Sequence, residues 1–243
     1  MTINSQSPDA RQSDISLTEA SLTKASLTDA QSAARLQAAA DELGITLSGQ
    51  QIAQLLDYAR LFMHWNKAYN LSAVRTLPMV VDRHLIDSLS VVSQVAAYCP
   101  KCIADIGTGG GLPGVVLAIL FADTPVYLVE SIGKKCRFLS HVRATLPLNN
   151  VEVIQQRVEA WQPEFACSVV VSRAFASLKQ FTQLTRHLGD ESSVWLAMKS
   201  ADIADELNAL QDSEFVIASD KPITVPFEPA KRRLISLTLR KTP

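Results

Sequence analysis

The chain has few cysteines and no long apolar run. Its 243 residues contain four cysteines, too few for a disulfide framework in a chain of this size, so we expect a reducing compartment. No apolar run reaches the roughly 18 residues that a membrane-spanning helix requires. The polar start MTINSQSPDARQSD lacks the basic and apolar regions of a signal peptide. These absences predict a soluble, cytoplasmic globular protein without a membrane partner.

The cysteines also give little support to a metal site. Cys99 and Cys102 form a CxxC pair, but neither Cys136 nor Cys167 has a second cysteine at that spacing. A structural zinc site requires a second ligand pair. We therefore expect no metal, and a zinc or redox role for the CxxC pair is the minor alternative.

Neither sign of charge dominates, because 23 lysines and arginines face 24 acidic residues. Residues 16–30 repeat the units SLTEA, SLTKA and SLTDA, which are too short and too polar to bury a face. We expect residues 1–30 to form a disordered low-complexity tail, with a marginal helix as the alternative. This tail holds four acidic and two basic residues, so the remainder of the chain is near neutral.

Residues 31–97 have helical periodicity and predict a helical extension that packs on the rest of the protein. Ser48 and Gln51 have the spacing of a capping box. The apolar residues that follow recur at steps of three or four, as a buried helix face requires: Ile52, Leu55, Leu56, Ala59, Phe62 and Met63.

A second helix is predicted to begin near Pro78 and to carry RHLIDSL, residues 83–89. Its inward residues are expected to be Ile86, Leu89 and Val92. The polar remainder is Arg83, His84 and Asp87. A solvated helix face is the favoured interpretation of Arg83 and His84, and a ligand contact is the alternative.

From residue 98 onward, short β-branched runs alternate with helical stretches. The runs CIADI, VYLVE, VEVIQ, SVVVS and SVWLAM are typical of strands, and KKCRFLSHVRATL is typical of a helix. This alternation predicts an α/β domain over residues 98–243, built from βαβ units around a parallel sheet. Ligands of such sheets bind at the carboxyl ends of the strands.

Glycine is scarce, and five of the chain's nine glycines lie in IADIGTGGGLPGVVLAI, residues 103–119. The five are Gly107, Gly109, Gly110, Gly111 and Gly114. They follow the first predicted strand and open the first helix, where glycine permits positive φ and close approach of a ligand to the backbone. The stretch indicates the floor of a nucleotide pocket, a purely structural turn being the alternative. It satisfies GxGxG as well as the dinucleotide pattern GxGxxG.

Asp105 favours S-adenosylmethionine over NAD as the nucleotide. Within the signature DxGxGxG its carboxylate would repel a pyrophosphate but tolerate an ammonium and a sulfonium group. Glu130 closes the second strand and can accept both ribose hydroxyls, which NAD enzymes also require, so it does not discriminate. Glu159 follows the third strand, where it or the backbone of Val158 could bond adenine; a solvated helix residue is the alternative.

Several segments together resemble one family. They are RHLIDSL (83–89), ADIGTGGGLPGVVLAI, VESIGKKCRFL, QQRVEAW and VSRAFASL (171–178). In this order over residues 45–243 the chain is similar to the glucose-inhibited division protein B family, bacterial small-subunit ribosomal RNA methyltransferases that modify guanine N7. The resemblance implies a class I, Rossmann-like methyltransferase fold with a seven-stranded, mostly parallel sheet and an N-terminal helical extension.

The resemblance also implies the ligands. The cofactor would be S-adenosyl-L-methionine, and the substrate 16S ribosomal RNA, within the 30S subunit or an assembly intermediate. By residue match, the implied cofactor-binding residues are Gly107, Leu112, Glu130, Ser131, Val158, Glu159 and Arg173. The loop signature DxGxGxG adds Asp105, Gly109 and Gly111 as candidates. Which of Glu130 and Ser131 bonds the ribose is left open. We expect a monomer.

Guanine N7 carries a free lone pair and no proton, so its methylation requires no general base. The fourth strand ends in SRAF rather than the NPPY-type motif of amino-group methylation, which agrees with an N7 target. Candidate positioning residues are Arg173, Ser172 and Lys199. For Arg173 we favour an anion-holding role over a structural ion pair. Phe175 could stack on a base, although a core position is the favoured interpretation.

Two basic segments are candidates for RNA contact. One holds Lys134, Lys135 and Arg137, and the other holds Lys231, Arg232 and Arg233. We expect them to share a face with Arg83 and His84, with scattered solvated charge as the alternative. KRRL, residues 231–234, is expected to precede the last strand and to be exposed.

Two other classes of function stay open at this point. GxGxxG alone would also suit an NAD-dependent oxidoreductase, which Asp105 opposes. A non-catalytic ribosome-assembly or regulatory protein could keep the same fold, and the intact glycine loop argues against it.

Overall fold

The structure is a computed structural model that describes residues 29–173, 175, 177–200, 203–211, 213–229 and 232–240. Of the tail predicted over residues 1–30, residues 1–28 lie outside the described ranges, and so does the predicted RNA contact Lys231.

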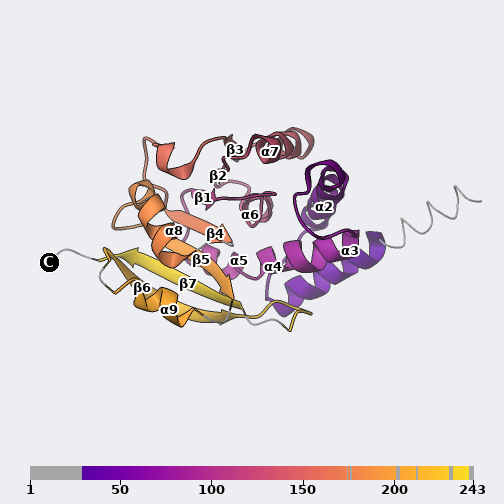
Figure 1. Ribbon diagram of the computed structural model, residues 1–243. Helices are drawn as coiled ribbons and strands as arrows, with labels where there is room; N and C mark the ends of the chain where they lie inside the picture. Colours follow the sequence, from indigo (N-terminus) through magenta and orange to yellow (C-terminus); the bar gives the residue numbers. More distant parts are fainter. Residues whose placement is uncertain are drawn as a thin grey trace, which may run out of the picture.

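Within the described residues, seven strands form one sheet in the order β3-β2-β1-β4-β5-β7-β6 (Figure 1). Five strands are parallel: β1 (Ile103–Ile106), β2 (Val126–Val129), β3 (Val151–Ile154), β4 (Val169–Arg173) and β5 (Val194–Ser200). The last two, β6 (Phe215–Ile223) and β7 (Arg232–Leu239), are antiparallel to their neighbours. The predicted α/β fold with a mostly parallel sheet is confirmed.

The strands are apolar on both sides because helices cover both faces of the sheet. The buried residues of the described ranges form two hydrophobic cores. Alternate residues of β1 point into different cores, Ile103 into the first and Ala104 into the second. The first core is completed by α6 (Gly114–Leu120) and α7 (Gly133–Thr145), and the second by α8 (Leu178–Thr185) with the short elements η2 (Val158–Ala160), η3 (Arg186–Leu188) and α9 (Ala204–Asn208).

The N-terminal helices pack against the first core (Figure 1). They are a helix over residues 29–42, α2 (Gly49–Tyr69), α3 (Leu77–Val80), the π-helical turn η1 (Val81–Ile86), α4 (Asp87–Leu89) and α5 (Val92–Ala96). The predicted capping box of α2 is confirmed, since Ser48 and Gln51 bond each other's backbone N–H. Leu55, Ala59 and Phe62 of the predicted stripe are buried.

The second predicted helix is confirmed in its start and its buried face. It begins at Leu77, one residue before Pro78, and runs without interruption through α3, η1 and α4, so that it carries RHLIDSL, although RHLI lies in the π-helical turn. Ile86, Leu89 and Val92 are buried as predicted.

One local prediction was wrong. Arg232 and Arg233 lie inside β7 rather than before it, and both pair with carboxylates, so they are only partly exposed.

The strand order places the site. From β1 the chain proceeds to β2 and β3 on one side, and then to β4 and β5 on the other. This change of side between β1 and β4 leaves a crevice at the carboxyl end of β1, where ligands of open α/β sheets bind. Among the described helices, none is long and apolar enough to cross a membrane.

Candidate functional site

The glycine loop after β1 leaves its backbone bare at one position. Gly107 has φ of 64°, a conformation that side chains rarely adopt, and a Cβ atom there would meet no atom within 4 Å. Gly114 is required for a different reason, because a Cβ there would lie 2.3 Å from Leu128. The loop is therefore shaped partly by packing and partly by open space beside Gly107.

The carboxylate of Asp105 fixes the glycine loop through two hydrogen bonds. Its Oδ2 atom accepts hydrogen bonds from Thr108 Oγ1 at 2.6 Å and from the backbone N–H of Gly114 at 2.7 Å. The side chain is fully buried, and Oδ1 receives no bond from the described residues. Burial raises the pKa of Asp105 to about 6, against the lowering effect of the two hydrogen bonds.

The N-terminal extension also supports the loop. Tyr58 of α2 donates a hydrogen bond of 2.6 Å to the carbonyl of Gly110, and the ring of Phe62 lies where a Cβ of Gly110 would be. Burial raises the pKa of Tyr58, so its hydroxyl stays protonated. Phe62 was predicted only as a core residue, and Tyr58 was missed because nothing local marks a tyrosine that reaches a loop 52 residues away.

A cavity of about 220 Å³ lies beside the bare loop position. We call it the smaller cavity; it is lined by Gly107, Glu130, Ser131, Val158, Glu159 and Phe175, among others. Five of these residues come from the ends of three neighbouring strands, as the sequence predicted. The sixth, Phe175, follows the end of β4.

Glu130 has a supporting role within the smaller cavity. Its carboxylate accepts hydrogen bonds from the backbone N–H groups of Gly109 at 3.2 Å and Ile132 at 2.9 Å, and it pairs with Lys135 at 3.4 Å. It therefore ties the glycine loop to the start of α7. Lys135, predicted to contact RNA, takes part in this ion pair and keeps 26% of its side chain exposed.

A second cavity of about 520 Å³ lies between the N-terminal helices and β4, β5 and β7. We call it the larger cavity; its charged and polar lining residues are Arg83, His84, Asp87, Arg173, Lys199, Ser200, Glu206 and Arg232. Four cationic side chains face two carboxylates there, so the lining has an excess of positive charge. Phe175 lines this cavity as well as the smaller one, so the two cavities adjoin.

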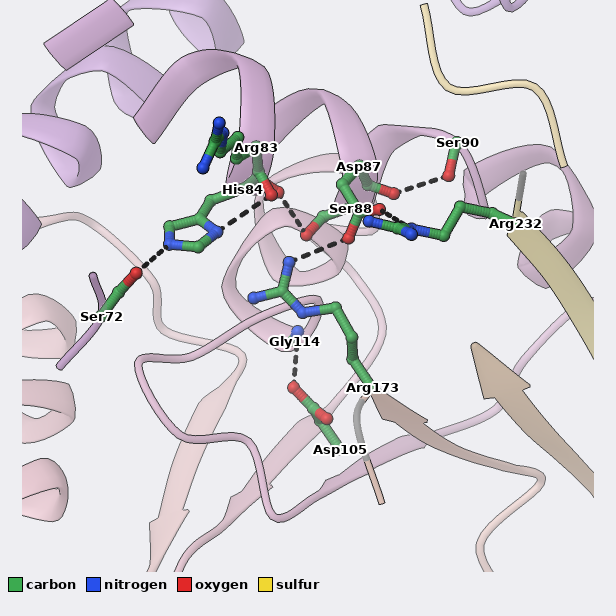
Figure 2. Close-up of polar contacts among 10 residues, drawn as sticks. All are labelled: Ser72, Arg83, His84, Asp87, Ser88, Ser90, Asp105, Gly114, Arg173 and Arg232. Atoms are coloured by element: carbon green, nitrogen blue, oxygen red, sulfur yellow. Dashed lines mark hydrogen bonds and ion pairs between the residues drawn. The ribbon is translucent and has the colours of Figure 1, made fainter. Parts of the chain in front are cut away.

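Asp87 joins three elements at the larger cavity (Figure 2). One oxygen accepts a hydrogen bond of 2.9 Å from Arg173 of β4, and the other lies 3.4 Å from Nε of Arg232 of β7. The Asp87 side chain is 8% exposed and that of Arg173 22%. The structural ion pair considered for Arg173 therefore exists, and Arg173 still lines the cavity.

His84 is a neutral residue in this cationic setting. Burial, reinforced by the Arg173 guanidinium, lowers the pKa of His84 to about 4. Its Nε2 lies 2.8 Å from Ser72 Oγ, and its ring packs edge-on against Phe62. Arg83 is exposed, and its side chain points away from the Asp87 network (Figure 2).

Lys199 and Glu206 form a second charged pair in the larger cavity. Lys199 Nζ lies 2.8 Å from Glu206 Oε2 and donates a hydrogen bond of 3.0 Å to the carbonyl of Phe175. Glu206 Oε2 also accepts from the backbone N–H of Leu178 at 2.7 Å. The pair fixes the segment that follows β4.

Five of the predicted cofactor-binding and positioning residues line neither the smaller nor the larger cavity. Ser172 is buried and donates a hydrogen bond to the carbonyl of Ile106, so it lines neither cavity. Asp105, Gly109, Gly111 and Leu112 also line neither cavity; they shape the loop beneath. Arg173 lines the larger cavity and not the smaller one.

The predicted basic residues do not gather in one cavity. Arg83, His84 and Arg232 line the larger cavity, whereas Lys134, Lys135 and Arg137 lie on α7 and line neither cavity. Arg137 packs over the ring of Tyr69, and Arg233 pairs with Asp220.

Glu206 and the linking role of Asp87 were missed. Asp87 was noticed only as a polar residue of a helix. Both carboxylates act through partners far away in the sequence, Asp87 being 86 residues from Arg173, and no local pattern marks such pairs.

The strand order and the glycine loop define the class I methyltransferase fold. Solved structures of similar fold include the glycopeptide N-methyltransferase MtfA, with a TM-score of 0.54, 10% identity and coverage of 62% of this chain and 95% of that one. Another is an S-adenosylmethionine-dependent methyltransferase from Aquifex aeolicus, with a TM-score of 0.51, 11% identity and coverage of 67% and 94%.

Residues 51–235 match the family described as GidB, rRNA small subunit methyltransferase G, and the chain belongs to this family. It is 49% identical over 212 residues to the ribosomal RNA small subunit methyltransferase G of Pseudomonas syringae pv. syringae, covering 87% of this chain and 96% of the relative. The protein of that name from Pseudomonas entomophila is 46% identical over 207 residues, covering 85% and 95%. The resemblance inferred from the motifs is confirmed.

Proposed function

We propose that this chain transfers the methyl group of S-adenosylmethionine to N7 of a guanine in small-subunit ribosomal RNA. Family membership supports the enzyme class, the cofactor and the RNA substrate. The observation that carries the proposal is the pair of adjoining cavities that share Phe175. The smaller cavity receives the nucleoside part of the cofactor, and the larger one receives the target base.

The residues around the smaller cavity fit such a cofactor. The backbone of Gly107 is open toward it, so a ligand can approach where a side chain would stand. Glu130 or Ser131 holds the ribose, and Val158 with Glu159 holds the adenine. Arg173 can bond a carboxylate while it stays paired with Asp87, because a guanidinium carries five N–H donors.

The mechanism requires alignment rather than proton transfer. When bound, the cofactor supplies an electrophilic methyl group on a sulfonium. Guanine N7 has a lone pair and loses no proton, so no side chain has to act as a base. His84, whose pKa is about 4, is neutral at pH 7. Arg173 and Lys199 act as positioning residues, and holding the reactants in place can supply several kcal/mol of rate enhancement, up to about 7–11 kcal/mol.

RNA contact is assigned to two cationic regions. The first is the larger cavity, where Arg83 has its side chain exposed. The second is α7, whose residues from 133 to 145 include no acid. Lys134 and Arg137 are exposed there. We expect these two groups to contact phosphates at different points of the RNA. The RNA is methylated within the 30S subunit or an assembly intermediate. The protein acts in the cytoplasm as a monomer.

The test is methyl transfer from radiolabelled S-adenosylmethionine to small subunits that lack their native modification, with naked RNA in parallel. Label recovered as 7-methylguanosine after digestion is the expected result. Label in another nucleoside would contradict the N7 assignment. With an active control enzyme present, no label in any substrate would contradict the enzymatic proposal and favour a non-catalytic RNA-binding protein.

A further inference from the structure

We propose that Glu206 reads the Watson–Crick edge of the target guanine and thereby determines base specificity. This inference rests on the proposed function, because it places the target base in the larger cavity. Guanine carries two hydrogen-bond donors, N1–H and the 2-amino group, and both lie on the edge opposite N7.

The orientation of the base follows from the position of the reacting atom. N7 must face the smaller cavity, which meets the larger one at Phe175. The opposite edge of the base then faces the lining of the larger cavity. Burying N1–H and the 2-amino group without acceptors would leave two unsatisfied donors, which is unfavourable. An acceptor is therefore needed on that lining.

Two carboxylates line the larger cavity within the described residues, and one of them is already engaged. Each oxygen of Asp87 faces an arginine, one at 2.9 Å and the other at 3.4 Å. Glu206 differs, because Oε2 accepts both of its hydrogen bonds, from Leu178 and Lys199. Oε1 receives none from the described residues, and the side chain is 26% exposed at the cavity.

Glu206 is also held in place, as a residue that reads a base must be. The Leu178 N–H at 2.7 Å and the Lys199 ammonium at 2.8 Å fix Oε2 from two directions. Lys199 is itself anchored to the carbonyl of Phe175, the residue at the junction of the cavities. The carboxylate therefore keeps a fixed position relative to the junction at which N7 reacts.

The charge of the carboxylate matters as well as its position. In the transfer, a bond forms between N7 and the methyl carbon while the carbon–sulfur bond breaks and leaves its electron pair on sulfur. Positive charge thus moves from sulfur to guanine, and no proton moves. A carboxylate that accepts from N1–H and the 2-amino group bonds the cationic base more strongly than the neutral one.

The test compares guanosine with inosine at the methylated position of reconstituted small subunits. Inosine keeps N7 and N1–H but lacks the 2-amino group. We expect the wild-type protein to prefer guanosine about tenfold in kcat/KM, the size of one charge-assisted hydrogen bond. In E206Q the preference should fall to within about twofold, because a neutral amide holds the amino group weakly. E214Q, at an exposed glutamate paired with Arg186, is the matched control and should keep the wild-type preference.

A second readout avoids the cofactor. Binding of the same guanosine and inosine subunits, measured by filter binding without S-adenosylmethionine, should show the same loss of preference in E206Q. If E206Q does not fold, as judged by its urea unfolding curve, E206D keeps the charge and should retain a preference of intermediate size. An unchanged preference in folded E206Q, or in E206D where E206Q does not fold, would overturn the proposal for Glu206, and so would the absence of any preference in the wild-type protein. A wild-type protein that methylates neither substrate would instead overturn the proposed function, and this inference with it.

Discussion

Replacing Asp87 by asparagine removes the charge that links β4 and β7 to the N-terminal helices. The side chain keeps its size, so the change isolates the carboxylate. Arg173 and Arg232 then both lose their counterion, and both line the larger cavity.

The size of the effect follows from the two contacts. The 2.9 Å bond to Arg173 lies in a region where Asp87 is 8% and Arg173 22% exposed, and such a charged hydrogen bond contributes about 1.5–3 kcal/mol. The contact with Arg232 is longer, at 3.4 Å, and Arg232 is 37% exposed, so its contribution is below about 1 kcal/mol. We expect D87N to lower the free energy of unfolding by about 2–3 kcal/mol.

Urea unfolding at pH 7 measures this change, and D57N is the matched control. Asp57 pairs with Arg60 on the surface and is 53% exposed, so its loss should change the free energy of unfolding by no more than about 0.5 kcal/mol. D87N should also reduce kcat/KM for methyl transfer at least about tenfold, because Arg173 is no longer held. If D87N unfolds like D57N and transfers methyl groups at the wild-type rate, the network does not position Arg173.

Four further changes test other parts of the structure. G114A should destabilise by at least about 2 kcal/mol in urea unfolding, since its Cβ would lie 2.3 Å from Leu128; wild-type stability would refute the packing argument. S48A should cost about 1 kcal/mol through the lost cap, and no change would refute the cap's contribution. His84 has a lowered pKa, so its neutral form stabilises the fold above about pH 6.5, and this is lost as pH falls toward 4. H84Q should therefore flatten the acid limb of the curve of unfolding free energy against pH, and an unchanged limb would contradict this assignment. Asp105 has a raised pKa, so stability falls as pH rises from about 4 to 6, by up to about 3 kcal/mol; D105N should remove this fall, and a fall that persists would contradict it.

Local sequence patterns predicted the elements whose signal comes from neighbouring residues. The β-branched runs became β1 to β5, and the capping box became the start of α2, because both signals act between neighbouring residues. β6 was not predicted from its residues. It is an edge strand that contains Asp220, Lys221 and Pro222, a combination that also reads as a turn.

The candidate site was predictable where strand ends determine it. Gly107, Glu130 and Glu159 meet in the smaller cavity because parallel strands bring their carboxyl ends to one edge. The larger cavity depends on pairs that topology alone does not reveal. Asp87 meets Arg232 across 145 residues, and Lys199 meets Glu206 through a helix too short to have a periodic signal.

In the proposed function, the smaller cavity binds the cofactor and the larger cavity binds the RNA. The most direct measurement is a comparison of E159A, at the smaller cavity, with R83A, at the larger one. For each variant, the Kd for S-adenosylmethionine is measured by calorimetry and the KM for small subunits by methyl transfer. We predict that E159A raises the Kd for the cofactor about tenfold and leaves the KM unchanged, and that R83A raises the KM and leaves the Kd unchanged. If both variants shift both constants alike, or if R83A alone weakens the cofactor, the division between the two cavities is contradicted.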